Sequence, residues 1–190
     1  MAFLRREGEE TGRIAGANVF LRYPEARDFA AWSALRAESR AFLQPWEPTW
    51  PEDELSIASF RYKLRRYAHD IRDGKAFPFF VFRTADAALV GGATLSQVRR
   101  GAAQAATLGY WVGAPFQGRG YTTDATIAVT RFAFEELDLH RVEAACQPEN
   151  APSRRVLAKA GFEEEGRARA YLKINGAWRD HVLFGKVREG

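Results

Sequence analysis

The stretch Gln117-Gly118-Arg119-Gly120-Tyr121-Thr122 decides the fold, because it joins a strand-like run (residues 105–112) to a helix-like run (residues 121–138). Glycines at alternate positions let a backbone approach a ligand closely and adopt φ values that other residues avoid. The helix that follows brings unpaired N–H groups and the positive end of its dipole to the same place. This combination predicts an anion site that suits a phosphate or a pyrophosphate.

Length and composition predict one globular domain. The chain has 190 residues, of which 46% are hydrophobic and 27% are charged, and this is enough for a sizeable core. The formal charge of +4 suits an anionic partner without requiring nucleic acid, so we expect no DNA partner. A lone cysteine excludes an internal disulfide and fits a reducing compartment. No run of sequence has the length of a membrane span or the pattern of a signal peptide, so we expect a cytoplasmic protein with no membrane partner.

The order of elements predicts an α/β fold. We expect a mixed, mostly antiparallel sheet of about six or seven strands with helices on both faces. Residues 1–17 are expected to be a loose lead-in, and residues 18–187 the domain. Strand-like runs cover residues 19–23, 77–82, 88–95, 105–112, 141–147, 162–165, 170–174 and 178–187. Helical patterns begin at Pro24 and cover residues 52–71, 121–138 and 153–160. The proline-rich residues 42–48 are expected to be irregular.

The residues alone leave more than one ligand for the glycine stretch. No GxxxxGK[ST] run exists, which excludes a P-loop. A dinucleotide fingerprint needs GxGxxG, and Thr123 stands where its third glycine should be. A turn that merely requires two glycines is a further alternative.

A resemblance narrows this choice. Gln117-x-x-Gly120-x-Thr122 resembles the [RQ]-x-x-G-x-[GA] coenzyme A loop of the GCN5-related N-acetyltransferases (GNAT family), with Thr122 in place of the usual Gly or Ala. The segment from His140 to Phe162, with Asn150-x-x-Ser153, resembles the next strand and helix of that family. The resemblance covers roughly residues 18–187. It implies a single GNAT domain whose sheet splays centrally, acetyl-CoA as co-substrate, no metal and no covalent enzyme intermediate.

Two longer stretches resemble one subgroup, the bacterial ribosomal-protein alanine N-acetyltransferases. Residues 42–48 resemble its FLxPWEP stretch, and residues 171–181 resemble its YLxIDGxWRDH hairpin. The resemblance implies acetyl transfer to an α-amino group, in that subgroup the N-terminal alanine of a ribosomal protein.

The resemblance also implies a cofactor site. The Val112 N–H would polarise the thioester carbonyl, with Trp111 and Tyr110 in support. Arg119 either assists the pyrophosphate or is simply solvated, and Asn150 either holds the pantetheine arm or shapes a turn. The expected cofactor-binding residues are Trp111, Val112, Gln117, Gly118, Arg119, Gly120, Tyr121, Thr122, Asn150 and Ser153.

Three residues are expected to carry the proton transfers. An α-amino group has a pKa near ~7.7–8, so a carboxylate suffices as base, directly or through a water. Glu47 is our choice, the alternative being an exposed loop glutamate. Ser153 would protonate the leaving thiolate, or else cap its helix. Tyr171 is the second choice as acid, with a role in the hairpin core as its alternative.

The acceptor side is expected to include Trp46, Glu47, Tyr110, Trp178 and His181. Cys146 lies mid-strand and is expected to pack rather than react. The three histidines lack metal-ligand spacing. The basic residues 61–66 are expected to form a solvated helix face, with ribosomal RNA as an alternative contact.

Three functions follow from these residues. The first is an N-acetyltransferase for a protein N-terminus, with a ribosomal protein or the ribosome as partner. The second is a GNAT enzyme for a small amine, such as an antibiotic or a polyamine. The third is a non-catalytic acetyl-CoA-binding module. A monomer and a homodimer are both compatible with the sequence.

Overall fold

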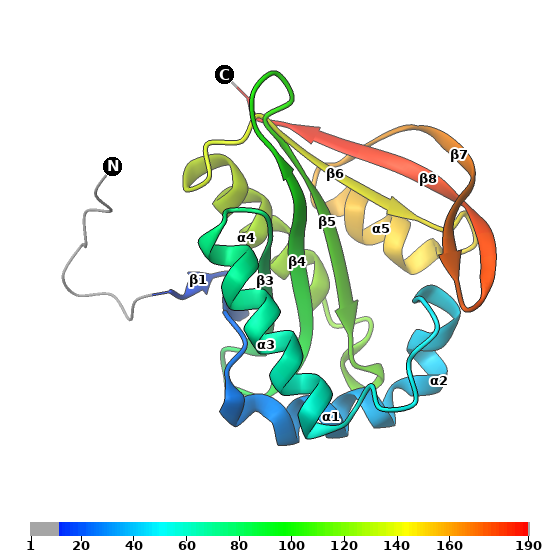
Figure 1. The fold of residues 1–190 in the computed structure, drawn as a ribbon. Helices are drawn as coiled ribbons and strands as arrows, with labels where there is room; N and C mark the ends of the chain where they lie inside the picture. Colours follow the sequence, from blue (N-terminus) through cyan, green and yellow to red (C-terminus); the bar gives the residue numbers. More distant parts are fainter. Residues whose placement is uncertain (1–11, 190) are drawn as a thin grey trace.

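The computed structural model describes residues 12–189, in which an eight-stranded sheet carries helices on both faces (Figure 1). The strand order is β1-β2-β3-β4-β5-β6-β8-β7. The strands are β1 Ile14–Ala15, β2 Val19–Arg22, β3 Phe77–Arg83, β4 Leu89–Arg99, β5 Ala105–Val112, β6 Arg141–Cys146, β7 Glu163–Ile174 and β8 Ala177–Val187. The α-helices are α1 Phe29–Glu38, α2 Arg40–Leu43, α3 Ile57–Arg72, α4 Tyr121–Glu135 and α5 Ala151–Lys159. Short 3-10 turns are η1 Ala26–Asp28, η2 Gln44–Trp46 and η3 Ala114–Phe116.

The sheet opens between β5 and β6. All neighbouring strands pair antiparallel except β5 and β6, which pair in parallel. That pairing joins residues 105–108 of β5 to residues 141–144 of β6. Beyond Leu108, β5 continues to Val112 beside β4 alone, and β6 continues to Cys146 beside β8. The expected mixed sheet with a central splay is therefore confirmed, with slightly more strands than expected.

Two hydrophobic clusters hold the layers together. One contains Leu95, Val129, Val142 and Leu157 and fills the space between the sheet and the helices α4 and α5. The other contains Trp32, Phe60 and Phe80 and lies under α1 and α3. Each fully buried side chain of this size stabilises the fold by about 1.5–3 kcal/mol. Successive β3 residues face opposite clusters, because side chains alternate along a strand.

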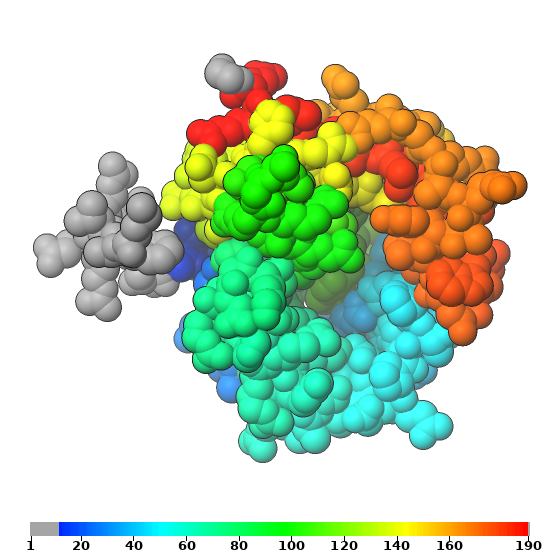
Figure 2. All heavy atoms as spheres, turned by 45° about the horizontal axis from the view of Figure 1, so that its top comes forward, coloured from blue at the N-terminus to red at the C-terminus, as the bar shows by residue number. Residues whose placement is uncertain are grey.

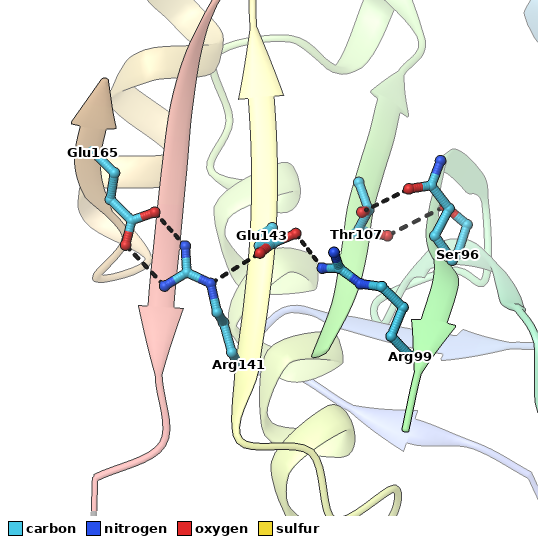
Figure 3. A network of polar contacts seen from close by, with 7 residues as sticks. Ser96, Arg99, Thr107, Arg141, Glu143 and Glu165 are labelled. Carbon is cyan, nitrogen blue, oxygen red and sulfur yellow. Dashed lines mark hydrogen bonds and ion pairs between the residues drawn. The ribbon is translucent and has the colours of Figure 1, made fainter. Parts of the chain in front are cut away.

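A polar network crosses the part of the sheet where β5 and β6 are still paired. Figure 3 shows Arg99 of β4 and Arg141 of β6 on either side of Glu143, and Arg141 continues to Glu165 of β7. These side chains are partly exposed, so each pair alone contributes little. Together they connect β4, β6 and β7 at the end where β5 and β6 remain paired, and not where the strands part.

The structure differs from the expectations in three places. Residues 42–48 contain regular turns, α2 and η2, because Pro45 lies in the first turn of η2, where its missing N–H is not needed. The two strands expected at 162–165 and 170–174 form one strand, β7, with register shifts at residues 164–166 and 168–172. The strand β1 lies within the expected lead-in, of which residues 1–11 are outside the described part.

No helix within residues 12–189 is long and apolar enough to cross a membrane.

Candidate functional site

The glycine loop leads directly into α4. Gly118 and Gly120 have φ values of 72° and 83°, in the left-handed region that glycine adopts without strain. Gly120 is the N-cap, and the first helical bond joins the Asp124 N–H to the Gly120 carbonyl at 3.0 Å. The N–H groups that precede it have no acceptor within the helix. The loop from Gln117 to Gly120 is exposed, so these donors can receive an anion from solvent.

Asp124 would oppose an anion if its carboxylate faced the loop, because it lies in the first turn of α4. Its oxygens instead accept the backbone N–H groups of residues 17–19, at 2.7, 2.6 and 3.2 Å. The turn between β1 and β2 therefore compensates this charge. The N–H groups at the start of α4 could therefore still receive an anion at the exposed loop.

The end of β5 presents a main-chain donor to the splay. The Gly113 N–H donates to the Val90 carbonyl at 2.9 Å. Donors alternate along an antiparallel ladder, so the Val112 N–H points away from β4, toward the gap that β6 leaves. A small cavity at this point is lined by Gly91, Gly92, Tyr110, Trp111, Val112 and Thr122.

Tyr110 joins this strand to the start of α5. Its hydroxyl oxygen lies 2.7 Å from Ser153 Oγ. Burial raises the pKa of Tyr110 well above its ordinary value, so the phenol stays protonated. Asn150, and not Ser153, is the N-cap of α5, since its side chain accepts the Ser153 N–H at 3.1 Å. The Ser153 hydroxyl is therefore not used in capping.

Cys146 lies beside this pair, at the end of β6. It is buried and belongs to the core cluster with Val182 and Phe184. Burial raises the pKa of its thiol, although a hydrogen bond with Ser153 opposes this. A buried, protonated thiol is a poor nucleophile.

Glu47 is neither exposed nor free. Arg36 of α1 donates to its two carboxylate oxygens at 2.7 and 2.6 Å, and Trp50 Nε1 donates to Oε2 at 2.7 Å. The carboxylate lies against α1, where three donors hold it. Its role as a base toward an acceptor amine stays a prediction.

The loop around Glu47 is tied to the β7–β8 hairpin. The N–H of Asn175, in the hairpin turn, donates to the Glu47 carbonyl at 2.9 Å. Gln147, directly after β6, also holds the loop, since its Nε2 donates to the Pro45 carbonyl at 3.0 Å. Both segments identified by subgroup resemblance therefore meet in space. Trp46 ends η2 within this loop and is partly exposed.

The hairpin exposes aromatic side chains. Trp178 is 65% and Tyr171 is 46% exposed, whereas His181 is buried. The Tyr171 ring meets the His181 ring edge-on, with centroids 5.7 Å apart. His181 Nδ1 lies 3.1 Å from the Arg179 carbonyl, which can only accept, so Nδ1 carries the proton. Nε2 of a neutral His181 is then an acceptor.

Figure 2 shows a hollow in the surface above the open part of the sheet. It is bordered by the segment after η2 (cyan), α3 (teal), the β4–β5 turn (green) and β7 (orange). The hollow lies on the side where the Glu47 loop and the hairpin meet.

A larger cavity of ≈ 690 Å³ lies apart from these residues, beside β2 and the β3–β4 turn. Arg22 on its wall is paired with Asp28 and Glu25, and its guanidinium also covers Phe82. None of the expected site residues lines it. Within residues 12–189 no group of three or more His, Cys, Asp or Glu side chains could hold a metal ion.

Arg36 is the site residue that the sequence reasoning missed. A usable signal was present, because Arg36 lies on the same helix face as Phe29, Trp32 and Leu35. An arginine on an apolar face is buried, and a buried charge requires a partner. The nearest carboxylate in the proline-rich segment is Glu47.

The chain is similar to known proteins along most of its length. The family model described as "Acetyltransferase (GNAT) domain" matches residues 18–163. The [Ribosomal protein uS5]-alanine N-acetyltransferase of Escherichia coli is 36% identical over 171 residues, which cover 90% of this chain and 88% of that protein. The probable N-acetyltransferase YjcK of Bacillus subtilis is 36% identical over 171 residues, covering 90% and 94%.

Solved structures are similar throughout the fold. Mycobacterium smegmatis RimJ in complex with CoA-disulfide has a TM-score of 0.86 and 38% identity, covering 93% of this chain and 86% of that chain. The ribosomal-protein-S5-alanine acetyltransferase of Vibrio fischeri has a TM-score of 0.86 and 29% identity, covering 93% and 97%.

Proposed function

The chain belongs to the GCN5-related N-acetyltransferase (GNAT) family and is an acetyl-CoA-dependent N-acetyltransferase of the RimJ/RimL type, and we propose that its acceptor is a protein N-terminus, in particular the N-terminal alanine of a ribosomal protein. The observation that carries the proposal is the contact between the Glu47 loop and the hairpin, the two segments of subgroup resemblance. A ribosomal-protein acceptor would place the reaction in the cytoplasm.

The charge of the acceptor side favours a peptide over a polyamine. The Glu47 carboxylate is neutralised by Arg36, while Tyr171 and Trp178 expose aromatic surface nearby. A polycation would require uncompensated acids, whereas a peptide backbone needs an open, weakly charged groove. The hollow in Figure 2 is open at the surface and suits a chain end that enters from solvent.

The donor side would be held by backbone. Bound acetyl-CoA supplies the activated thioester. The N–H groups at the start of α4 would donate to its pyrophosphate, with the helix dipole in support. Exposed Arg119 would add positive charge. The Val112 N–H would donate to the thioester oxygen as it becomes negative, and one such donor is worth about 3 kcal/mol.

The acceptor amine needs little help to lose its proton. With a pKa near ~7.7–8, an appreciable fraction of an α-amino group is neutral at cytoplasmic pH. The Glu47 oxygens already accept three hydrogen bonds, which leaves this carboxylate one further acceptor site, for the amine proton directly or through a water. The neutral amine would attack the thioester carbon, and the C–S bond would break without a covalent enzyme intermediate.

The thiolate would leave beside Ser153. The Ser153 hydroxyl would donate its proton to sulfur. The Tyr110 hydroxyl, which lies 2.7 Å from Ser153 Oγ and donates to the Ser153 carbonyl at 3.2 Å, would turn its proton to Ser153 Oγ in that step. Tyr171 is less suited as the acid. It contacts His181, which is next to Val182 on β8. Val182 faces the core cluster on which α5 packs, and side chains alternate along a strand, so His181 and Tyr171 face the side of the sheet opposite to α5 and Ser153.

The test is thiol release from acetyl-CoA with a panel of acceptors. Peptides beginning with Ala, the same peptides with an acetylated N-terminus, polyamines and aminoglycosides are compared without added metal. We expect turnover with the free alanine peptides. Faster turnover with a small amine would replace the peptide proposal, and cofactor binding with no turnover on any acceptor would indicate a non-catalytic module.

A further inference from the structure

We propose that Arg36 is a positioning residue that fixes the acceptor loop and links it to the donor side of the site. This inference rests on the proposed function, since it assigns how the acceptor side of that same site is held. Nothing in the resemblance assigned Arg36 a role.

Arg36 makes the contacts that orient the loop. Its guanidinium binds both oxygens of Glu47 at 2.7 and 2.6 Å, a bidentate geometry that fixes direction as well as distance. The same guanidinium lies 4.2 Å from the ring of Trp50. Trp50 in turn donates to Glu47 at 2.7 Å. Arg36, Glu47 and Trp50 therefore form a closed triangle.

Arg36 also touches the strand that carries the expected carbonyl donor. Its guanidinium lies 4.9 Å from the Trp111 ring, and Trp111 precedes Val112. The Trp111 indole lies directly over Gly92 of β4, where a Cβ would meet Nε1 at 2.5 Å. Glycine at this position lets the indole approach β4 and present its face to Arg36. The cation is thus held between an acceptor-loop tryptophan and a donor-strand tryptophan.

Burial makes these contacts strong. Arg36 is 6% exposed, and its Nε has no hydrogen-bond partner among the described residues. Taking a guanidinium out of water is costly, and here Glu47 is the carboxylate that offsets the cost. A surface pair would tolerate a change of geometry, but a buried bidentate pair does not.

Leu35 of α1 and Ser39, which follows the end of α1, contact the segment that leads into the glycine loop. Ser39 Oγ, which is fully buried, accepts the Ala114 N–H at 2.8 Å. Leu35 packs so closely on Gly113 that a Cβ there would lie 2.3 Å from Leu35 Cδ1. Gly113 and Ala114 lead into the glycine loop. One turn of α1 therefore holds Glu47 on one side and the start of the cofactor loop on the other.

Loss of Arg36 should affect the two substrates, the peptide and acetyl-CoA, to different extents. The Glu47 carbonyl accepts from Asn175, so a displaced Glu47 also releases the hairpin from the loop. The acceptor groove would lose its shape, while Ser39 and Leu35 continue to hold the donor side. Loss of Arg36 should therefore raise the KM for a peptide far more than the KM for acetyl-CoA.

The experiment compares Arg36→Lys, Arg36→Met and Glu47→Gln with Arg40→Met, using an alanine-starting peptide and acetyl-CoA. Arg40 is the matched control, because it is exposed and its guanidinium lies 5.6 Å from the same Trp50 ring. We expect both Arg36 variants and Glu47→Gln to raise peptide KM about tenfold or more, with acetyl-CoA KM changed less than about threefold. Arg40→Met should change neither constant. Arg36→Lys should not restore peptide KM, because an ammonium cannot make the bidentate contact.

Other outcomes would overturn the inference. Equal rises in both KM values, with a lowered Tm, would mean that Arg36 only stabilises the fold. If Arg36→Met does not fold, the peptide KM of Glu47→Gln decides, because this variant keeps the buried arginine and removes the charge of its partner; loss of the proposed base would lower kcat and would not by itself raise peptide KM. Unchanged peptide KM in Glu47→Gln refutes the positioning role. Failure of the native enzyme to acetylate any peptide instead refutes the proposed function on which this inference depends.

Discussion

The hydroxyl oxygens of Tyr110 and Ser153 lie 2.7 Å apart and join the diverging end of β5 to the first turn of α5. The contact is available because Asn150 caps the helix and leaves the Ser153 hydroxyl unused there. Tyr110 is kept protonated by burial, which raises its pKa. We expect the two hydroxyls to act together as a proton relay, with the thiolate leaving beside them.

Replacing Ser153 with Ala should lower kcat by about 100-fold, the usual size of a general-acid contribution. The fold should be retained, because the Asn150 cap uses the Ser153 backbone N–H and not its hydroxyl. Steady-state rates and Tm measure the two effects. Tyr110→Phe is the companion variant, and we expect a smaller loss of kcat because Ser153 can still donate. An unchanged kcat in Ser153→Ala would move the acid elsewhere.

Gly120→Val should weaken acetyl-CoA binding about tenfold or more. A β-branched residue at φ 83° is strained, and relief of that strain would turn the N–H groups at the start of α4 away from the pyrophosphate. Gly101→Val in the β4–β5 turn is the control, since Gly101 has φ 67° and likewise has no atom within 4 Å of an added Cβ. Both variants should lose similar stability, but only Gly120→Val should change acetyl-CoA affinity in a calorimetric titration. Equal affinities would show that the loop is not the cofactor site.

The sequence correctly predicted the elements that depend mainly on neighbouring residues. The two glycines before α4 and the meander of β3, β4 and β5 follow from turn chemistry and periodicity within short windows. The sequence pattern predicts two strands, at residues 162–165 and 170–174, whereas the structure joins them as β7. Register shifts between residues 164 and 172, with Ala170 at φ 46°, interrupt the regular alternation on which such patterns depend. Pairing with a neighbouring strand supplies the continuity that the window lacks.

Long-range pairing limited the prediction of the site. Sequence reasoning identified Glu47, but its partner Arg36 lies on α1, and the contact depends on how α1 meets the Glu47 loop. Ser153 was expected either to cap its helix or to act as an acid, and the structure shows that Asn150 is the cap, so the acid role stays a prediction. Side-chain partners of this kind can be identified only when the fold is known, because the sequence specifies residue types and not the directions in which their side chains point.

Cys146→Ala should retain kcat, because the thiol is buried, protonated and unnecessary for direct attack by an amine. Burial raises the thiol pKa, so the thiolate of the native protein forms only above the ordinary cysteine range. Alkylation by iodoacetamide should therefore lag behind that of the unfolded chain at pH 8 and approach it only at higher pH. A loss of kcat beyond about tenfold, with Tm maintained, would require a covalent or thiol-dependent step.

The hairpin should affect the acceptor and not the proton transfer. Tyr171→Phe keeps the ring that meets His181 at 5.7 Å and removes only the hydroxyl, so kcat and peptide KM should both be retained. Trp178→Ala removes a side chain that is 65% exposed, so Tm should change little while peptide KM rises several-fold. Initial rates over a series of peptide lengths would locate the contact, because a peptide too short to reach Trp178 should not distinguish the variant from the native enzyme. A large loss of kcat in Tyr171→Phe would instead make Tyr171 the acid, and would place the leaving thiolate on the hairpin side of the sheet.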